Sequence, residues 1–171
     1  MLKRASPMLD IFLQPGEYFV GDATYRVRTL LGSCVSITLW HPGMRVGAMS
    51  HFILASGGRR RGASLDGRYG EDALVLMLGE LKRAGVAAEQ CHAKIFGGGD
   101  MFPGQVKKDV LRIGDRNGEE ARALLRRHNI KVVSESLFGV GHRQIVFDVS
   151  TGHVWGRQVR PIGSEARNDR K

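Results

Sequence analysis

Short runs of strand-forming residues, separated by turn residues, recur along most of this chain, and only two stretches have the periodicity of a helix. Together they predict an α+β fold: a single layered domain with a mixed β-sheet, mainly hairpin-connected, and two main helices. The predicted strands cover Glu17–Leu31 (two strands around a turn at Gly21–Asp22), Val35–Trp40, Arg45–Leu54, His92–Phe96, Ile130–Glu135, Arg143–Val149 and His153–Val159.

The two helical stretches differ in how they begin. In Tyr69–Ala84, apolar residues recur at helical spacing, acidic residues lie near the start and basic residues near the end, and Gly85 is placed to end the helix. In the second stretch Asn117 precedes Glu120 by three residues, which resembles a capping box. We therefore predict that the second helix begins at Asn117 and runs to about residue 128.

The length of 171 residues suits one domain, and neither a repeat nor a linker divides it. We expect residues 1–160 to form this domain and 161–171 to be a flexible basic tail. No apolar run approaches the roughly 20 residues that span a bilayer, and the first residues lack the features of a secretory signal. With only two cysteines in the chain, these features predict a cytoplasmic protein without membrane insertion.

The net charge of +9 predicts attraction to an acidic partner, which is a nucleic acid, an anionic membrane face or an acidic protein. Aromatic residues make up only 7% of the chain, and no nucleic-acid-binding module is recognisable. We therefore expect no nucleic-acid partner. Charge alone does not choose among the remaining acidic partners.

One cysteine and one histidine lie where the predicted hairpin can bring them together. Cys34 follows Gly32–Ser33 at a strand junction, and His51 lies on the partner strand. Antiparallel pairing through the hairpin turn places His51 near that junction, so the two residues are candidates for a nucleophile and its base. Thr29, on the incoming strand, is a candidate to orient the imidazole. The alternative is a small buried cysteine beside a structural histidine.

Other residues have possible roles around this pair. Backbone N–H groups near Gly32 and Ser33 are candidates to hold an oxyanion, and we expect Gly98 and Phe102 to border a substrate groove. Asp100 and Asp148 are alternative orienting groups that no spacing favours. Cys91 and His92 are adjacent, but no second pair stands at zinc-type spacing, so the sequence predicts no metal site and a packing role for Cys91.

Several segments, spread in order from about residue 17 to 160, resemble the CheD family of chemoreceptor glutamine deamidases. The resemblance covers nearly the whole predicted domain. The segments are Thr29–Val35, Gly47–His51, Tyr69 with Asp72–Leu74, Ala93–Gly99 with Met101–Phe102, Ile113–Gly114 with Arg116–Asn117, and Gly141–Arg143 with Thr151–Gly152.

The resemblance implies a Cys–His–Thr site at Cys34, His51 and Thr29, and a fold related to the catalytic domain of deamidating toxins. It implies hydrolysis of selected glutamine side chains on methyl-accepting chemotaxis receptors, without a metal or organic cofactor. Receptor signalling regions are long helical hairpins rich in acidic residues, which suits the positive charge of this chain. The resemblance also implies a CheC-type phosphatase as a partner.

Other readings of the same residues remain open. The chain is alternatively a non-catalytic regulator that binds receptors or a CheC-type phosphatase. A cysteine thioester also permits transfer to another acceptor, and the site also suits methyl-ester hydrolysis. We expect Arg59–Arg61 to lie near the substrate groove, with a solvated loop as the alternative.

Overall fold

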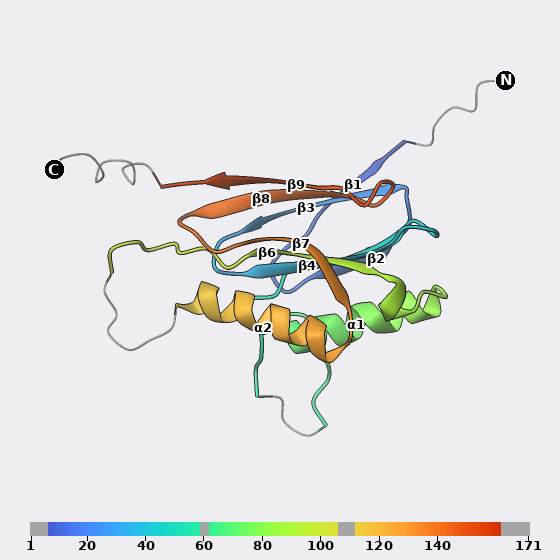
Figure 1. The fold of residues 1–171 in the computed structure, drawn as a ribbon, viewed down its shortest axis with the longest axis horizontal. Helices are drawn as coiled ribbons and strands as arrows, with labels where there is room; N and C mark the ends of the chain where they lie inside the picture. Colours follow the sequence, from blue (N-terminus) through green and yellow to red (C-terminus); the bar gives the residue numbers. More distant parts are fainter. Residues whose placement is uncertain (1–6, 59–61, 106–111, 162–171) are drawn as a thin grey trace.

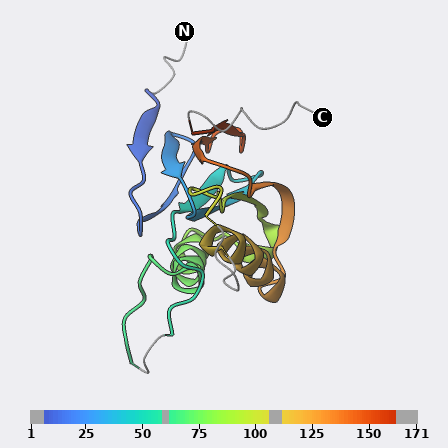
Figure 2. The same cartoon turned by 90° about the vertical axis from the view of Figure 1, so that its left-hand side faces the viewer.

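The computed structural model describes residues 7–58, 62–105 and 112–161 as three stacked layers (Figure 1). A four-stranded sheet lies on one side, a five-stranded sheet lies in the middle, and two helices cover the outer face of the five-stranded sheet. The view in Figure 2 shows the same order of layers, with the helices at the opposite end from the strands of the four-stranded sheet. The α+β class predicted from the sequence is confirmed.

The two sheets draw their strands from interleaved parts of the chain. The four-stranded sheet has the order β1-β3-β8-β9, with β1 parallel to β3 and the other pairs antiparallel. The five-stranded sheet has the order β2-β5-β4-β6-β7, with only β6 and β7 parallel. The bounds are β1 Leu9–Phe12, β2 Tyr18–Gly21, β3 Tyr25–Leu31, β4 Val35–His41, β5 Val46–Ser50, β6 His92–Gly97, β7 Lys131–Leu137, β8 His142–Asp148 and β9 Val154–Val159.

Each interface between layers has its own apolar cluster, set by the alternation of side chains along the strands. On β4, Val35, Ile37 and Leu39 face the helices α1 (Gly70–Arg83) and α2 (Ile113–Arg127). The side chains on the other face of the five-stranded sheet point towards the four-stranded sheet. There Met49 and Phe96 pack against Val27, Leu31 and Phe147. The middle sheet is therefore buried on both faces, and on β4 the polar residues Ser36 and Thr38 are buried along with the apolar ones.

Two features of the strand connections differ from the prediction. The segment Glu17–Leu31 does form two strands, but β2 and β3 belong to different sheets, so they are not a hairpin. Between β6 and β7 the chain passes through α2 and returns in parallel, which makes one βαβ unit. Among the described residues, β4–β5 and β8–β9 are the connections that pair sequential strands antiparallel.

The start of the second helix was also predicted wrongly. The helix α2 begins at Ile113, four residues before Asn117, and Arg112 at its N-cap makes no side-chain capping bond. Asn117 lies inside the helix with 1% of its surface exposed, and its amide bonds to other segments of the chain. A buried tertiary contact, which a local motif does not reveal, therefore explains why an asparagine stands here.

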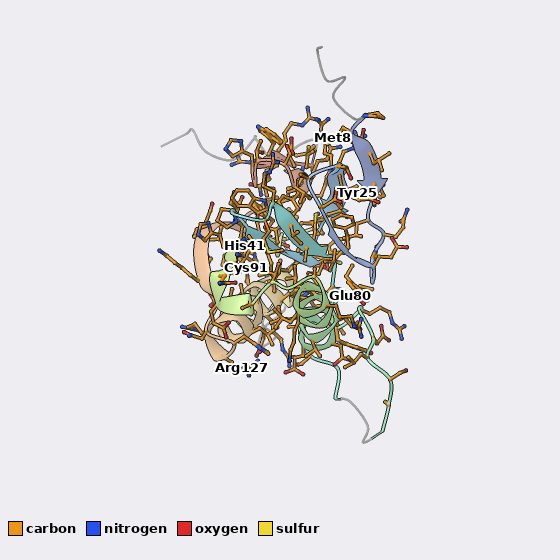
Figure 3. The ribbon with its side chains drawn as sticks, turned by 90° about the vertical axis from the view of Figure 1, so that its right-hand side faces the viewer. Met8, Tyr25, His41, Glu80, Cys91 and Arg127 are labelled. Atoms are coloured by element: carbon orange, nitrogen blue, oxygen red, sulfur yellow. The ribbon has the colours of Figure 1, made fainter. Side chains whose placement is uncertain are left out.

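The first helix agrees with its prediction, because α1 covers Gly70–Arg83 between flanking residues Tyr69 and Ala84. Figure 3 shows Glu80 of α1 and Arg127 of α2 in the helix layer, on the opposite side of the molecule from Met8. The described part of the chain contains no helix that combines the length and the apolar character needed to cross a bilayer. The segment Arg59–Arg61 and the tail beyond residue 161 lie outside the described residues.

Candidate functional site

The turn that carries Cys34 also carries the chain from one sheet to the other. Strand β3 of the four-stranded sheet ends at Leu31, and β4 of the five-stranded sheet begins at Val35. Gly32, Ser33 and Cys34 therefore span the gap between the layers at one end of the sheets. A thiol at this corner is half-buried, neither within the core nor fully exposed.

Strand register places the side chains of Cys34 and His51 on the same face of the five-stranded sheet. Val35 and Phe52 form an antiparallel bridge in which each N–H donates to the other's carbonyl, at 3.1 and 3.0 Å. Because side chains alternate, the residues before Val35 and before Phe52 both point to the opposite face from this pair. They are diagonal neighbours, an arrangement whose side chains lie within reach of each other.

His51 is held by a chain of two short hydrogen bonds that cross between the layers. Thr29 Oγ1, on β3, lies 2.7 Å from His51 Nδ1 and also donates to the Leu13 carbonyl at 2.7 Å. Since the hydroxyl has one hydrogen and a carbonyl only accepts, that hydrogen goes to Leu13. Nδ1 of the neutral ring must then carry the hydrogen shared with Thr29. The other ring nitrogen, Nε2, is left unprotonated and able to act as a base.

The main chain around His51 is fixed as well. Its N–H donates to the Glu17 carbonyl at 3.1 Å, and its carbonyl accepts from Gly16 N–H at 2.8 Å. The side chain is 2% exposed, and this burial lowers the pKa of His51 to about 4. At neutral pH the imidazole is therefore uncharged in the folded protein.

Because folding lowers the pKa of His51, the free energy of unfolding decreases as the pH falls. His51 has a pKa of about 4 when folded, against 6.5 as its ordinary value, so between these limits the unfolded chain binds more protons. The stability contribution is complete above pH 6.5 and is lost as the pH falls towards 4. We expect this titration of His51 to lower the free energy of unfolding of the wild-type protein by about 2 kcal/mol when the pH falls from 7 to 5.

Urea unfolding at both pH values, compared with His51→Gln, isolates this contribution from that of the carboxylates. The substituted protein should lose about 2 kcal/mol less than wild type over the interval. Equal losses in the two proteins would mean that the folded imidazole titrates near its ordinary pKa.

The two thiols of the chain lie in different environments. Burial raises the pKa of the Cys34 thiol above its ordinary value, so the sulfur is protonated at neutral pH. Cys91 is 1% exposed in the apolar cluster between the helices and the five-stranded sheet, and burial raises its pKa to about 11. The packing role predicted for Cys91 is confirmed.

Backbone amides at the corner have distinct partners. Gly98 N–H donates to the Cys34 carbonyl at 2.9 Å, and Gly99 N–H donates to the Gly32 carbonyl at 2.9 Å. Within residues 7–58, 62–105 and 112–161, no carbonyl accepts the N–H of Ser33 or of Cys34, and the Cys34 N–H faces the sulfur of its own residue. The Gly98 amide is thus occupied and is not an oxyanion donor, whereas the amides of Ser33 and Cys34 have this capacity.

The loop after β6 lies against the same turn. A Cβ atom added at Gly32 would meet the Met101 sulfur at 3.1 Å, so this methionine covers the glycine. The adjacent Phe102 is 71% exposed, and its N–H donates to the carboxylate of Asp100 at 3.1 Å. Phe102 therefore presents a bare aromatic ring beside the turn that carries Cys34.

The two aspartates considered as orienting groups lie in other interactions. Asp100 accepts from Arg112 at 2.7 Å, and Asp148 accepts from the N–H and hydroxyl of Ser150 at 2.9 and 2.5 Å. Among the described residues, neither aspartate hydrogen-bonds to His51, whose imidazole instead bonds to Thr29. The described residues contain no cluster of three or more histidine, cysteine or acidic side chains able to hold a metal ion.

Two buried polar residues near the corner were not identified from the sequence as parts of the site. Asn117 bonds to both chain segments that carry the candidate pair. Arg143, 3% exposed, pairs with Leu31 across the four-stranded sheet and donates to the carbonyls of Ser136 and Phe138. Both occur within the matching segments, but without coordinates nothing in their spacing indicates what they bind.

Comparisons with known proteins agree with the sequence resemblance. The family model described as CheD chemotactic sensory transduction matches residues 54–158, more than half of the chain. The "Probable chemoreceptor glutamine deamidase CheD 2" of Albidiferax ferrireducens is 61% identical over 166 residues, which cover 96% of each chain. A protein of Chromobacterium violaceum named "Probable chemoreceptor glutamine deamidase CheD 1" is 42% identical over 86% of this chain and 77% of its own.

A more distant relative from Leptospira interrogans, also named "Probable chemoreceptor glutamine deamidase CheD 1", is 35% identical over 162 residues, covering 91% of this chain and 96% of its own. The identity with these relatives extends beyond the residues matched by the family model. The chain therefore belongs to the CheD family.

Proposed function

We propose that this protein hydrolyses the side-chain amides of selected glutamines on chemoreceptors, releasing ammonia and leaving glutamates. The observation that carries the proposal is the Thr29–His51 hydrogen bond in a chain whose relatives are named glutamine deamidases. The bond fixes a neutral imidazole on the sheet face that also bears the Cys34 thiol. A nucleophile, a base and an orienting group are the parts that thiol-based amide hydrolysis needs.

In the proposed reaction the thiol and the imidazole are both neutral at rest. His51 Nε2 takes the proton from Cys34 as the sulfur attacks the amide carbon of the glutamine. The resulting oxyanion accepts hydrogen bonds from the N–H groups of Ser33 and Cys34, and one such donor lowers the barrier by about 3 kcal/mol. The carbon–nitrogen bond then breaks, and protonated His51 gives its proton to the departing ammonia.

The second half of the reaction regenerates the thiol. Water attacks the thioester while His51 Nε2 takes one of its protons, and the carbon–sulfur bond breaks. His51 returns that proton to the sulfur, leaving a carboxylic acid that ionises to glutamate. The sum is one amide and one water converted to one acid and one ammonia, so no oxidant or cofactor enters the balance.

We expect Thr29→Val to lower turnover by about 10- to 100-fold, because the valine has nearly the same shape but leaves the Nδ1 hydrogen of His51 without its partner. Thr29→Ser keeps the hydroxyl and is the matched control. Initial rates of ammonia release from a receptor fragment measure the effect. Equal activity of the valine and serine proteins would remove the orienting role.

The substrate surface fits the exposed aromatic side chain beside the turn. Phe102 is 71% exposed and stands next to the methionine that covers Gly32, so a helix that reaches Cys34 passes close to it. The net charge of +9 favours an acidic helical partner. We place the reaction in the cytoplasm, where the two free thiols remain reduced.

The experiment that tests the function measures ammonia and binding together. Purified protein and a cytoplasmic chemoreceptor fragment are mixed, ammonia is followed with time, and binding is measured on the same samples. The proposal expects catalytic release of ammonia that depends on glutamines of the fragment. Binding without release would instead identify a non-catalytic regulator.

A CheC-type phosphatase is the second partner that we propose, on the ground of the family resemblance alone. Co-purification of the two proteins and a changed deamidation rate are expected on mixing them. An unchanged rate and separate elution at micromolar concentrations would remove this partner.

A further inference from the structure

We propose that Asn117 is a positioning residue for deamidation, acting by turning the Cys34 N–H towards the place where the oxyanion develops. This role depends on the proposed deamidase function. Asn117 touches neither substrate nor sulfur in this account. It acts through the peptide group that joins Ser33 to Cys34.

Both the amide nitrogen and the amide oxygen of the Asn117 side chain form hydrogen bonds, and their partners lie on two segments of the site. Its Nδ2 donates to the carbonyls of Ser33 at 3.1 Å and Ile53 at 2.8 Å. Its Oδ1 accepts from Ala55 N–H at 3.1 Å. One buried amide, 1% exposed, therefore ties the turn before Cys34 to the segment that follows His51.

The bond to Ser33 fixes the direction of the next amide. The peptide group between Ser33 and Cys34 is trans, because the structure has no cis peptide bonds among its described residues. In a trans peptide the C=O and N–H bonds point in opposite directions. With the Ser33 carbonyl held by Asn117 of α2, the Cys34 N–H points away from the helix layer.

That direction leads to the side on which the thiol lies. Cys34 packs partly against the apolar cluster between the two sheets, on the face of the five-stranded sheet opposite to α2. In the described part of the chain, no carbonyl accepts its N–H, which faces the sulfur of its own residue and so lies on the side of the thiol. The amide is thus held in place through its carbonyl and kept open for a ligand.

A second peptide of the same turn is held in the same manner. Gly99 N–H donates to the Gly32 carbonyl at 2.9 Å, so the N–H of Ser33 points away from Gly99. The two amides with oxyanion-binding capacity therefore each have a fixed carbonyl on their opposite side. Only at the Ser33–Cys34 peptide is the fixing group a side chain, which makes its contribution open to substitution.

The test compares two reactions of one sulfur in Asn117→Ala. Deamidation of a receptor fragment develops an oxyanion, whereas alkylation of Cys34 by iodoacetamide is a displacement at a saturated carbon and develops none. We expect kcat for deamidation to fall by about 10- to 100-fold with KM changed less than about threefold, because a misdirected donor approaches the effect of a deleted one. The alkylation rate should stay within about threefold of wild type.

Leu125→Val on the same helix is the matched control, since Leu125 is fully buried in the cluster beneath the sheet and makes none of these bonds. It should lower the unfolding midpoint while leaving kcat and alkylation near wild type. If Asn117→Ala does not fold, Asn117→Asp replaces it, because Asp keeps the acceptor for Ala55 N–H and the side-chain size but loses both donors.

A fall of kcat and alkylation together would mean that Asn117 only maintains the folded corner, and an unchanged kcat would mean that the amide needs no such support. Either result overturns the proposal. Failure of the deamidase function itself would be seen separately, as wild-type protein that releases no ammonia. If wild type and Asn117→Ala both release ammonia at the same rate, only the positioning role of Asn117 is rejected, and the deamidase function stands.

Discussion

Replacing His51 by glutamine is expected to reduce turnover by about 10³-fold or more, because the imidazole that we propose as the base for the Cys34 thiol is lost. Glutamine is close in size to histidine and can still bond to Thr29, whose hydroxyl lies 2.7 Å from Nδ1 in the native protein. Loss of activity would therefore not require loss of the fold. Ammonia release from a receptor fragment and the unfolding midpoint, measured on the same preparation, separate the two.

The same variant distinguishes two resting states of the site. Burial lowers the pKa of His51 to about 4 and raises that of Cys34, which describes a neutral pair and not a thiolate–imidazolium pair. The rate at which iodoacetamide alkylates Cys34 should then rise only at alkaline pH, and His51→Gln should leave this pH profile nearly unchanged. Rapid alkylation of wild type near pH 6, abolished by the substitution, would instead establish an ion pair.

Cys34→Ser is expected to lower turnover to a similar extent, by about 10³-fold or more. A serine hydroxyl needs a stronger base than a neutral imidazole of low pKa, and among the described residues Thr29, not a carboxylate, bonds to His51 Nδ1. The Thr29 contact orients the ring without stabilising its positive charge. A thiol, which gives up its proton more readily, suits this arrangement.

Cys91→Ser is the control for the second cysteine. Cys91 is 1% exposed, and its Sγ lies 3.7 Å from the Ala87 carbonyl, so serine can form a comparable contact there. This protein should keep turnover near that of wild type. Similar losses in the two cysteine variants would point to a general effect of removing thiols and not to a nucleophile.

The sequence predicted those parts of the fold that are governed by local patterns. The helix α1 follows from its apolar spacing, and the β4–β5 hairpin follows from two strands around a short turn. The register of that hairpin is also what places His51 on the face of Cys34. Local spacing was sufficient here because the two residues belong to neighbouring strands.

Long-range pairing was beyond prediction from the sequence. Nothing in the pattern of Tyr18–Leu31 indicates that its two strands enter different sheets, because each has one face to bury in either arrangement. The contact between the loop after β6 and the turn that carries Cys34 is also long-range, since Gly98 N–H donates to the Cys34 carbonyl across the β4–β6 pair. The spacing of Asn117 and Glu120 resembled a helix cap. The true partners of the Asn117 amide could not be predicted, because they lie on segments more than 60 residues away.

Mass spectrometry of a chemoreceptor fragment, incubated in ¹⁸O-labelled water with wild-type or Cys34→Ala protein, tests the nucleophile most directly. Exchange of an amide for a carboxyl group adds about one dalton in ordinary water and about three in labelled water. The account predicts a gain of about three daltons at particular glutamines with wild type and none with Cys34→Ala. The same gain at the same rate with Cys34→Ala would contradict it.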